Sequence, residues 1–130
     1  MPHETYAKEW LELARHNLEA AEILFQANHY TDIIGQELQQ SIEKTLKAIF
    51  ALEGWKIKRT HELSLLLKKV EDKLDIGEDY YDLCDIATTY YSEHRYPIAK
   101  SELPPVNEIE QVLNLAKMLY SQVYDLIYHQ

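Results

Sequence analysis

The amino-acid sequence predicts an all-α protein, an antiparallel up-and-down four-helix bundle with one additional short helix. Two observations lead to this fold class. Apolar residues recur at intervals of three and four along most of the chain, and this spacing places them on one face of an α-helix. The 3 glycines and 4 prolines sit at the ends of these long periodic stretches. No alternating pattern of useful length indicates a β-strand.

The first two predicted helices span residues 5–27 and 31–53. We expect the first to end at Asn28, because asparagine tolerates the left-handed backbone conformation that often ends a helix. Gly54 is expected to end the second. The residues expected to face inward are Tyr6, Trp10, Leu13, Ala14, Leu18, Ala21, Leu24 and Phe25 in the first helix, and Ile34, Leu38, Ile42, Leu46, Ile49 and Phe50 in the second.

Three further helices complete the predicted bundle. Thr60 can cap the third helix, and Gly77 separates it from a fourth over about residues 78–93. Prolines keep the segment 95–107 non-helical, and Asn107 with Glu110 forms a capping pair for the last helix, which runs to about Tyr128. The residues expected inward are Leu63, Leu66, Leu67, Val70 and Leu74, then Tyr80, Leu83, Cys84, Ala87, Tyr90 and Tyr91, then Ile109, Val112, Leu113, Ala116, Leu119, Val123 and Ile127.

Composition narrows the class of protein. The 130 residues are sufficient for one domain, which we expect to span residues 1–130, and 46% hydrophobic content is too high for a disordered acidic chain. A net charge of −9 disfavours loose wrapping around nucleic acid, although a small basic site is compatible with it. The single cysteine excludes an internal disulfide framework. Without a membrane-spanning run or a signal peptide, we expect a soluble, cytoplasmic protein with no membrane contact.

Most catalytic and metal-binding chemistry finds no support in the sequence. A di-metal carboxylate site in a bundle needs Glu-x-x-His pairs, and no carboxylate lies three residues before the histidines at positions 16, 29, 61, 94 and 129. The glycines are isolated, so there is no phosphate-binding glycine loop. Cys84 lies on the inward face of its helix and is interpreted as a core residue. We therefore expect no metal site and no cofactor.

Two polar patches remain as candidate sites. In the second helix, Gln36, Gln40, Glu43, Lys44 and Lys47 form a polar stripe at spacings of three and four, with Gln39 beside it. This stripe is either a solvated face, with Glu43 and Lys47 paired one turn apart, or part of a binding site. We expect Lys44 and Lys47 to tolerate replacement by glutamine with little change in fold, because an exposed ion pair contributes only about 0–1 kcal/mol.

The second patch is the sequence SEHRYP, which is predicted to end the fourth helix. His94 and Arg95 there either complement the helix dipole or, beside Tyr96, provide a fork-shaped cation for a phosphate. We expect His61 to lie near Arg95, because the start of the third helix and the end of the fourth fall at the same end of the bundle if the two helices are antiparallel.

The order of these features resembles the HEPN family, small helical domains of prokaryotes that are often encoded beside minimal nucleotidyltransferases. The resemblance covers nearly the whole chain. It begins with Trp10 in an alanine-rich first helix and Tyr30 opening the second. It continues with Gln40, Glu43, Lys44, Lys47 and Ala48 as a QQ-x-x-EK-x-x-KA stretch, His61 with Leu63 and Leu66 as H-x-L, and Arg95, Tyr96 and Pro97 as an RYP element.

The resemblance implies a bundle related to the helical domain of antibiotic nucleotidyltransferases. It further implies a non-catalytic module that binds a nucleotide or the substrate of nucleotidyl transfer and acts with a minimal nucleotidyltransferase partner in a toxin–antitoxin-like pair. The nucleotide- or partner-binding candidates are Arg95, Tyr96, His61, His94, Gln40, Glu43, Lys44 and Lys47. We also expect a homodimer, because a long, narrow bundle rich in tyrosine has apolar surface left for a second copy.

The alternative is a metal-independent ribonuclease toxin of the same family, with RNA as substrate. Some HEPN proteins use an Arg-x(4–6)-His element, and here either register lacks one partner. If Arg95 is the arginine, the histidine should fall at residues 100–102, and if His94 is the histidine, the arginine should fall at residues 86–89, but neither stretch contains the required residue. His61 or His94 would then have to substitute in space, and a partner would silence the toxin by modifying a tyrosine such as Tyr96. A ligand-free dimeric scaffold is the third interpretation.

Overall fold

The structure, a computed structural model, describes residues 2–91 and 103–129. These residues form the helices α1 (Pro2–Gln26), α2 (Thr31–Glu53), α3 (Leu63–Val70), α4 (Asp79–Thr88) and α5 (Val106–Tyr128), with a short 3₁₀ helix η1 (Glu71–Lys73) and no β-strand in these two ranges. The predicted all-α bundle is confirmed. Three of the helices are long and two are short, whereas the sequence predicted four main helices and one shorter one.

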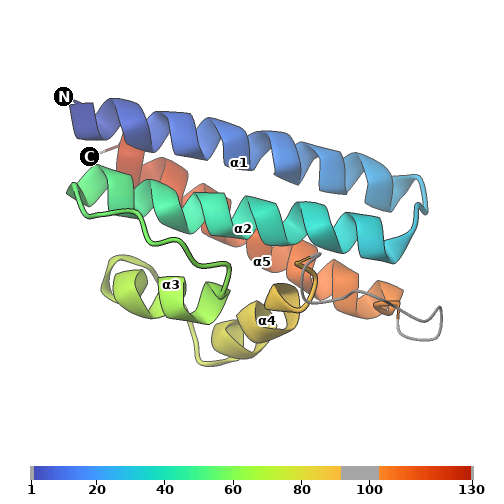
Figure 1. Cartoon of the computed structure of the whole chain (residues 1–130). Helices are drawn as coiled ribbons and strands as arrows, with labels where there is room; N and C mark the ends of the chain where they lie inside the picture. The colour runs from blue at the N-terminus through green and yellow to red at the C-terminus, as the bar shows by residue number, and fades with distance from the viewer. Residues whose placement is uncertain (1, 92–102, 130) are drawn as a thin grey trace.

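Helix α2 occupies the centre of the bundle and contacts all four other α-helices. Helix α1 runs antiparallel to α2, and α5 runs in the same direction as α2, so the two ends of the chain lie at the same end of the molecule (Figure 1). The short helices α3 and α4 pack against each other and against α2. As a consequence, α2 is covered on more sides than a peripheral amphipathic helix would be.

Helices α1 and α2 pack closely through small residues. The buried residues of α1 follow a strict four–three repeat and three of the five are alanine: Ala7, Leu11, Ala14, Leu18 and Ala21. The Ser41 hydroxyl of α2 donates a 3.0 Å hydrogen bond to the backbone oxygen of Ala14. The expectation that Tyr6 and Leu13 face inward was wrong, since they are 56% and 47% exposed. The buried stripe begins one residue after Tyr6, where alanine lets the two backbones approach.

The ends of the first two helices agree with the prediction. Asn28 has a φ of 55°, and Gly54 has a φ of 73°, so both adopt the left-handed conformation. The Gly54 backbone N–H donates to the carbonyl oxygen of Ala51, one of the carbonyls that the end of the helix leaves unpaired.

Three of the predicted helix ends were wrong. Thr60 does not cap α3: its hydroxyl accepts a hydrogen bond from the Glu62 N–H, and the helix begins at Leu63 without a side-chain cap. Helix α4 ends at Thr88 and not near residue 93. At this end, the hydroxyls of Thr88 and Thr89 donate hydrogen bonds to backbone carbonyls of the last turn and so compete with continuation of the helix.

The third of these ends is the start of α5. This helix begins at Val106, directly after the extended Pro105, so Asn107 lies inside the first turn and forms no capping pair with Glu110. The inward face of α5 is nevertheless as predicted, with all seven expected residues buried. Among the described helices, none has a sufficiently long apolar stretch to cross a membrane.

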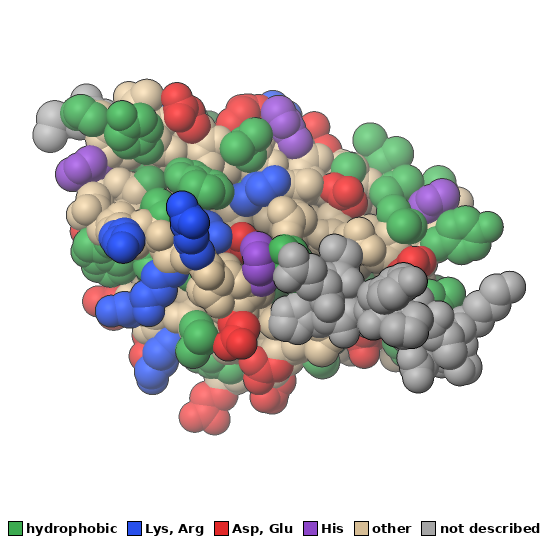
Figure 2. Space-filling model, viewed as in Figure 1, with side chains coloured by type: hydrophobic (Ala, Val, Ile, Leu, Met, Phe, Trp, Pro, Cys, Tyr) green, Lys and Arg blue, Asp and Glu red, His purple; other side chains and the backbone are tan. Residues whose placement is uncertain are grey.

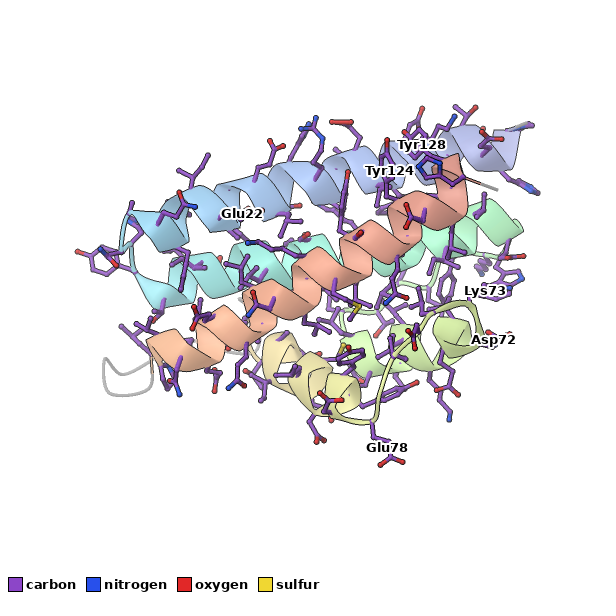
Figure 3. The ribbon with its side chains drawn as sticks, turned by 180° about the vertical axis from the view of Figure 1, so that it is seen from behind. Glu22, Asp72, Lys73, Glu78, Tyr124 and Tyr128 are labelled. Atoms are coloured by element: carbon purple, nitrogen blue, oxygen red, sulfur yellow. The ribbon has the colours of Figure 1, made fainter. Side chains whose placement is uncertain are left out.

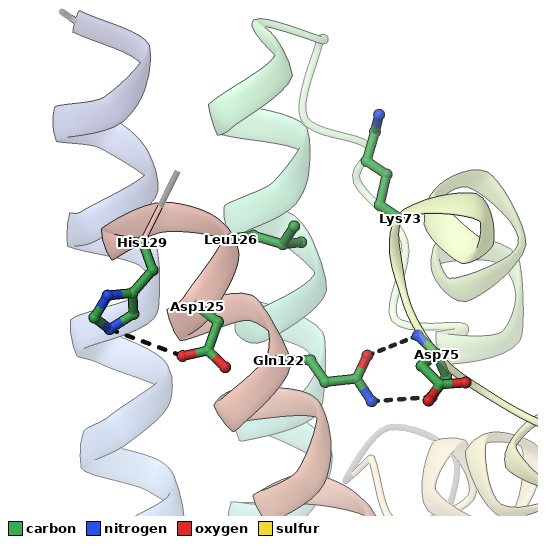
Figure 4. Close-up of a pocket in the computed structure, with 6 residues that line it drawn as sticks. All are labelled: Lys73, Asp75, Gln122, Asp125, Leu126 and His129. Atoms are coloured by element: carbon green, nitrogen blue, oxygen red, sulfur yellow. Dashed lines mark hydrogen bonds and ion pairs between the residues drawn. The ribbon is translucent and has the colours of Figure 1, made fainter.

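Side chains in the C-terminal half of α5 hold neighbouring segments against it. The Gln122 amide makes two hydrogen bonds to the backbone of Asp75, at 2.8 Å and 2.9 Å, and so ties the segment before α4 to α5 (Figure 4). Further along the same helix, the rings of Tyr124 and Tyr128 stack at 4.4 Å, and the Lys8 ammonium of α1 lies 4.9 Å from the Tyr128 ring centre (Figure 3).

Cys84 is buried in the core, as predicted. Burial raises the pKa of its thiol to about 12, which leaves it almost entirely protonated at neutral pH and therefore unreactive.

Candidate functional site

The polar stripe of α2 forms a buried network centred on Glu43. The Glu43 carboxylate accepts hydrogen bonds from the Lys47 ammonium at 2.7 Å, from the His61 Nδ1–H at 2.8 Å and from the Gln39 amide at 2.9 Å. Gln39 also lies 3.4 Å from the backbone oxygen of His61, and its own side-chain oxygen accepts from Gln40 at 2.7 Å. One carboxylate therefore connects α2 to the linker that leads into α3.

The interpretation of this stripe as a solvated face was wrong. Glu43 and Lys47 are only 5% and 6% exposed, and Gln39 is fully buried. The reason is that the linker after Gly54 runs back along α2 before α3 begins, which brings His61 to the middle of that helix (Figure 1). The Lys47 ammonium also lies 5.9 Å from the Trp10 ring of α1, so this cation is enclosed from both sides.

Glu43 remains ionised in this buried position. Burial by itself raises the pKa of its carboxyl, but the hydrogen bonds from Lys47, His61 and Gln39 together outweigh burial and hold that pKa below its ordinary value. An ionised carboxylate can only accept hydrogen bonds, so the proton shared with His61 belongs to Nδ1. Glu43 therefore fixes both the ring orientation and the tautomer of His61.

The other ring nitrogen of His61 takes no part in this network. Its side chain is 39% exposed, and its Nε2 atom has no hydrogen-bond partner among residues 2–91 and 103–129. The ring stacks on Tyr91, just beyond α4, with 3.8 Å between the ring centres and 18° between the planes. The stacking and the bond to Glu43 together hold the imidazole in one orientation, with Nε2 available as an acceptor in the neutral ring and as a donor in the protonated ring.

A small hollow lies beside this pair of rings. It has a volume of about 230 Å³ and is lined by Gln36, Gln39, Gln40 and Tyr91. Small-molecule pockets usually measure roughly 300–1,000 Å³. The hollow therefore has room for a part of a nucleotide, such as one phosphate or one base, with amide groups and an aromatic ring around it.

The structure brings together four of the predicted site residues, namely Gln40, Glu43, Lys47 and His61. Lys44 lies on a different face of α2 and donates a 2.9 Å hydrogen bond to the side-chain oxygen of Asn17 in α1. His94, Arg95 and Tyr96 lie outside the described residues, and so does the expected closeness of His61 and Arg95.

Sequence reasoning missed the roles of Gln39 and Tyr91. Gln39 precedes Glu43 by four residues, so helical spacing could have revealed their contact. Tyr91 was expected in the core, and no local pattern links it to His61, which lies 30 residues before it in the chain. Within the described part of the chain, no three His, Cys, Asp or Glu side chains are grouped in a way that could hold a metal ion.

Comparison with known proteins identifies the class to which this bundle and its polar network belong. A sequence profile of the HEPN domain family matches residues 7–126. This stretch is most of the chain, and the protein therefore belongs to the HEPN domain family.

Individual relatives agree with this assignment. The protein named "Putative toxin MJ1304", from Methanocaldococcus jannaschii, is 35% identical over 75 residues, which cover 58% of this chain and 48% of that protein. The crystal structure of TT1696 from Thermus thermophilus matches with a TM-score of 0.74 and 27% identity over 96% of this chain and 98% of that one. An archaeal HEPN homologue, ST0689, has the same fold, with a TM-score of 0.70 and 23% identity over 93% and 97% of the two chains.

Proposed function

We propose that this HEPN protein is a non-catalytic module that binds a nucleotide, or the substrate of nucleotidyl transfer, and acts with a minimal nucleotidyltransferase partner in a toxin–antitoxin-like pair. The observation that carries the proposal is the orientation of His61. Its Nδ1–H is bound to the buried Glu43 and its ring is stacked on Tyr91, so Nε2 is held in place at the surface. A pre-oriented group binds a ligand with little loss of side-chain entropy.

The surroundings of His61 suit one part of a nucleotide. Gln36 and Gln40 are half-buried and line the adjoining hollow, and a glutamine amide can donate and accept side by side, as the edge of a base requires. The Nε2 atom of His61 can accept a hydrogen bond from a base N–H in the neutral ring, and can donate one to a phosphate oxygen when the ring is protonated. Lys47 stabilises this arrangement through Glu43 and does not contact the ligand, because its charge is already paired in the interior. Arg95 and Tyr96 remain the candidates for the phosphate itself.

One observation favours a second candidate function, a ribonuclease toxin. A histidine held by a carboxylate is the arrangement that general acid–base catalysts use, and RNA cleavage through the 2′-hydroxyl requires such a group. A relative is named as a toxin, although the matched stretch covers only 48% of that protein. Against this candidate, the Arg-x(4–6)-His element is incomplete in the sequence.

Affinity measurements with AMP and ATP as probes test the first proposal. Isothermal titration calorimetry on the wild type, His61→Gln and His16→Gln supplies the comparison, because His16 is an exposed histidine on α1 with 60% side-chain exposure. We expect His61→Gln to weaken binding at least about tenfold, since one oriented hydrogen bond to a charged group contributes about 1.5–3 kcal/mol. We expect His16→Gln to bind like the wild type. Equal affinities for all three proteins would refute the proposal.

RNA cleavage distinguishes the second candidate from the first. Wild-type protein, His61→Gln and Arg95→Ala are incubated with end-labelled RNA in the presence of a chelator. The binding-module proposal predicts intact RNA in every reaction. Cleavage by the wild type that either substitution abolishes would replace it with the ribonuclease.

The protein is further proposed to form a homodimer. Its surface carries large exposed apolar side chains on α1 and α5, among them Tyr6, Leu13 and Tyr128. Burial of such residues across a two-fold axis is a common basis of dimer stability. Light scattering at micromolar concentration should give twice the mass of the 15.3 kDa chain. The mass of a single chain would contradict the dimer.

A further inference from the structure

A second hollow, beside the linker between α2 and α3, is lined largely by positively charged side chains. It has a volume of about 680 Å³ and is lined by Lys56, Ile57, Lys58, Arg59, Thr60 and Leu65. The lining that the structure describes contains no carboxylate. Figure 2 shows Lys and Arg side chains gathered on this face of the molecule, near the end of the bundle where α2 finishes.

The cations around this hollow are not paired within the described part of the chain. Lys56, Lys58 and Arg59 are all exposed, and none of them forms an ion pair with another described residue. Six of the 13 Lys and Arg residues of the chain lie within residues 55–73, against three Asp and Glu, in a protein whose net charge is −9. This face is therefore a local positive region on an otherwise acidic protein.

Apolar side chains lie between these cations. Ile57 is half-buried and packs against the core of the bundle, and Leu65 stands on the outward face of α3 with 53% of its surface exposed. A hollow of about 680 Å³ falls in the range of roughly 300–1,000 Å³ that is typical of sites for small ligands. It has room for a few apolar side chains at its centre, with a rim of positive charge.

We propose that this hollow is the docking site of an acidic peptide segment from a partner protein, one that places apolar side chains against Ile57 and Leu65 and carboxylates beside Lys56, Lys58 and Arg59. Charge complementarity selects the occupant. A protein of net charge −9 repels an acidic segment overall and attracts it at this positive hollow, which gives a preferred orientation and discrimination against acidic parts of the surface. The inference goes beyond the proposed nucleotide site and does not depend on it.

The lining favours a peptide over a nucleic acid strand. Proteins that hold single strands combine cations with aromatic rings on which the bases stack. The described lining has no aromatic residue. The nearest tryptophan, Trp55, is already engaged, because its ring meets Phe50 edge-on at 5.5 Å and the Lys73 ammonium lies 5.7 Å from its centre.

Selection from a random 12-residue peptide display library, with the wild-type protein as bait, tests this proposal even though the partner is unidentified. We expect the selected peptides to combine Asp or Glu with Leu, Ile or Phe. Their affinities, measured by fluorescence anisotropy, should fall at least about tenfold in the double variant Lys58→Glu/Arg59→Glu and also on raising the salt from about 0.05 to about 0.5 M, because exposed charges are screened.

Matched variants separate this site from general effects. Lys69→Glu makes the same kind of charge change on exposed α3 surface outside the hollow, and Val106→Ser removes an apolar group that is 63% exposed on α5. Both should bind the peptides like the wild type, whereas Leu65→Ser should bind at least about fivefold more weakly. His61→Gln should also leave peptide binding unchanged, so failure of the nucleotide proposal and failure of this one are distinguishable.

Several outcomes would overturn the proposal. These are selection of no peptides, selection of peptides without acidic residues, and peptide affinities that Lys58→Glu/Arg59→Glu leaves unchanged. Tighter binding of a labelled 12-nucleotide uridine strand, weakened by the same double variant, would assign the hollow to RNA. Self-association that this variant abolishes would assign it to a second copy of the chain.

Discussion

The buried pair of Glu43 and Lys47 allows a sharp test, because the two single substitutions should be more damaging than chemical intuition about a surface pair suggests. Glu43→Met leaves the Lys47 ammonium, which is only 6% exposed, without its ion-pair partner, and leaves the buried Gln39 amide with the longer 3.4 Å contact to the His61 backbone oxygen in place of its 2.9 Å hydrogen bond. An uncompensated buried charge costs about 3–5 kcal/mol. The expectation that Lys47→Gln is harmless applies only to an exposed pair, and this pair is buried.

The double variant Glu43→Met/Lys47→Met should recover much of this loss. It removes both charges and replaces them with apolar side chains of similar length, a change that is often neutral or stabilising when the rest of the site is satisfied. Here the Gln39 amide and the His61 Nδ1–H still lack the Glu43 carboxylate as acceptor, so about 1–3 kcal/mol of destabilisation should remain. Lys47→Met alone should cost about 3 kcal/mol, since Glu43 keeps His61 and Gln39 as donors.

Urea unfolding monitored by circular dichroism gives these free energies, with thermal melting as a second readout. For a chain of this length, 1 kcal/mol corresponds to a shift of about 3–5 °C in Tm. The Glu4–Lys8 pair has the same spacing and a 3.0 Å separation, but both side chains are about 40% exposed. Glu4→Met is therefore the matched control and should leave Tm nearly unchanged. A double variant as unstable as the sum of the two single ones would refute the account of a coupled buried pair.

The pH dependence of the unfolding free energy should also reflect the ionised, hydrogen-bonded state of Glu43. Because the folded-state pKa of Glu43 lies below its ordinary value, the unfolded chain binds more protons at this position, and the stabilisation is fully present above the ordinary pKa of about 4.3. It is lost as the pH falls through the lower folded-state pKa. The difference in unfolding free energy between the wild type and Glu43→Gln should therefore be constant near neutrality and shrink below about pH 4. A difference that grows on acidification would contradict this.

Three further substitutions probe the packing around α2. Gly35→Ala places a Cβ 2.8 Å from the ring of the buried Tyr90, so despite the better helix propensity of alanine it should lower stability by about 1–3 kcal/mol in urea unfolding. Thr45→Val should raise stability by about 1 kcal/mol, because the buried hydroxyl has no hydrogen-bond partner among the described residues. Ser41→Ala, which deprives the Ala14 carbonyl of a buried donor, should instead cost about 1 kcal/mol. A loss of stability in Thr45→Val or a gain in Ser41→Ala would show that the hydrogen bonding of that hydroxyl is assigned wrongly.

Local periodicity was sufficient to predict the inward faces of α2 and α5. In α5 the seven residues that were expected to face inward, from Ile109 to Ile127, recur mainly at three and four, and all of them are buried. In α1 the same reasoning favoured the larger residues Tyr6 and Leu13, whereas the buried stripe is built on alanine. The prediction selected the larger apolar side chains, whereas close packing of two helices prefers small side chains at the point of contact.

The candidate site depends on contacts that periodicity does not report. Helical spacing placed Glu43 and Lys47 one turn apart, which is correct, but whether that face is exposed depends on the path of the linker between α2 and α3. That linker carries His61 back over the middle of α2, and the end of α4 adds Tyr91. Short-range patterns describe one helix at a time, so they cannot show that this polar face is covered.

The most direct test of the central claim, that the His61 ring is the oriented contact of a ligand site, is NMR of the histidine ring nitrogens during a titration with AMP. Before addition, the spectrum should show the proton on Nδ1 of His61, as its bond to Glu43 requires. On saturation, the Nε2 resonance of His61 should shift while the ring resonances of His16 stay in place. An Nε2 resonance of His61 that does not move at saturating AMP, with binding verified by calorimetry, would contradict the account.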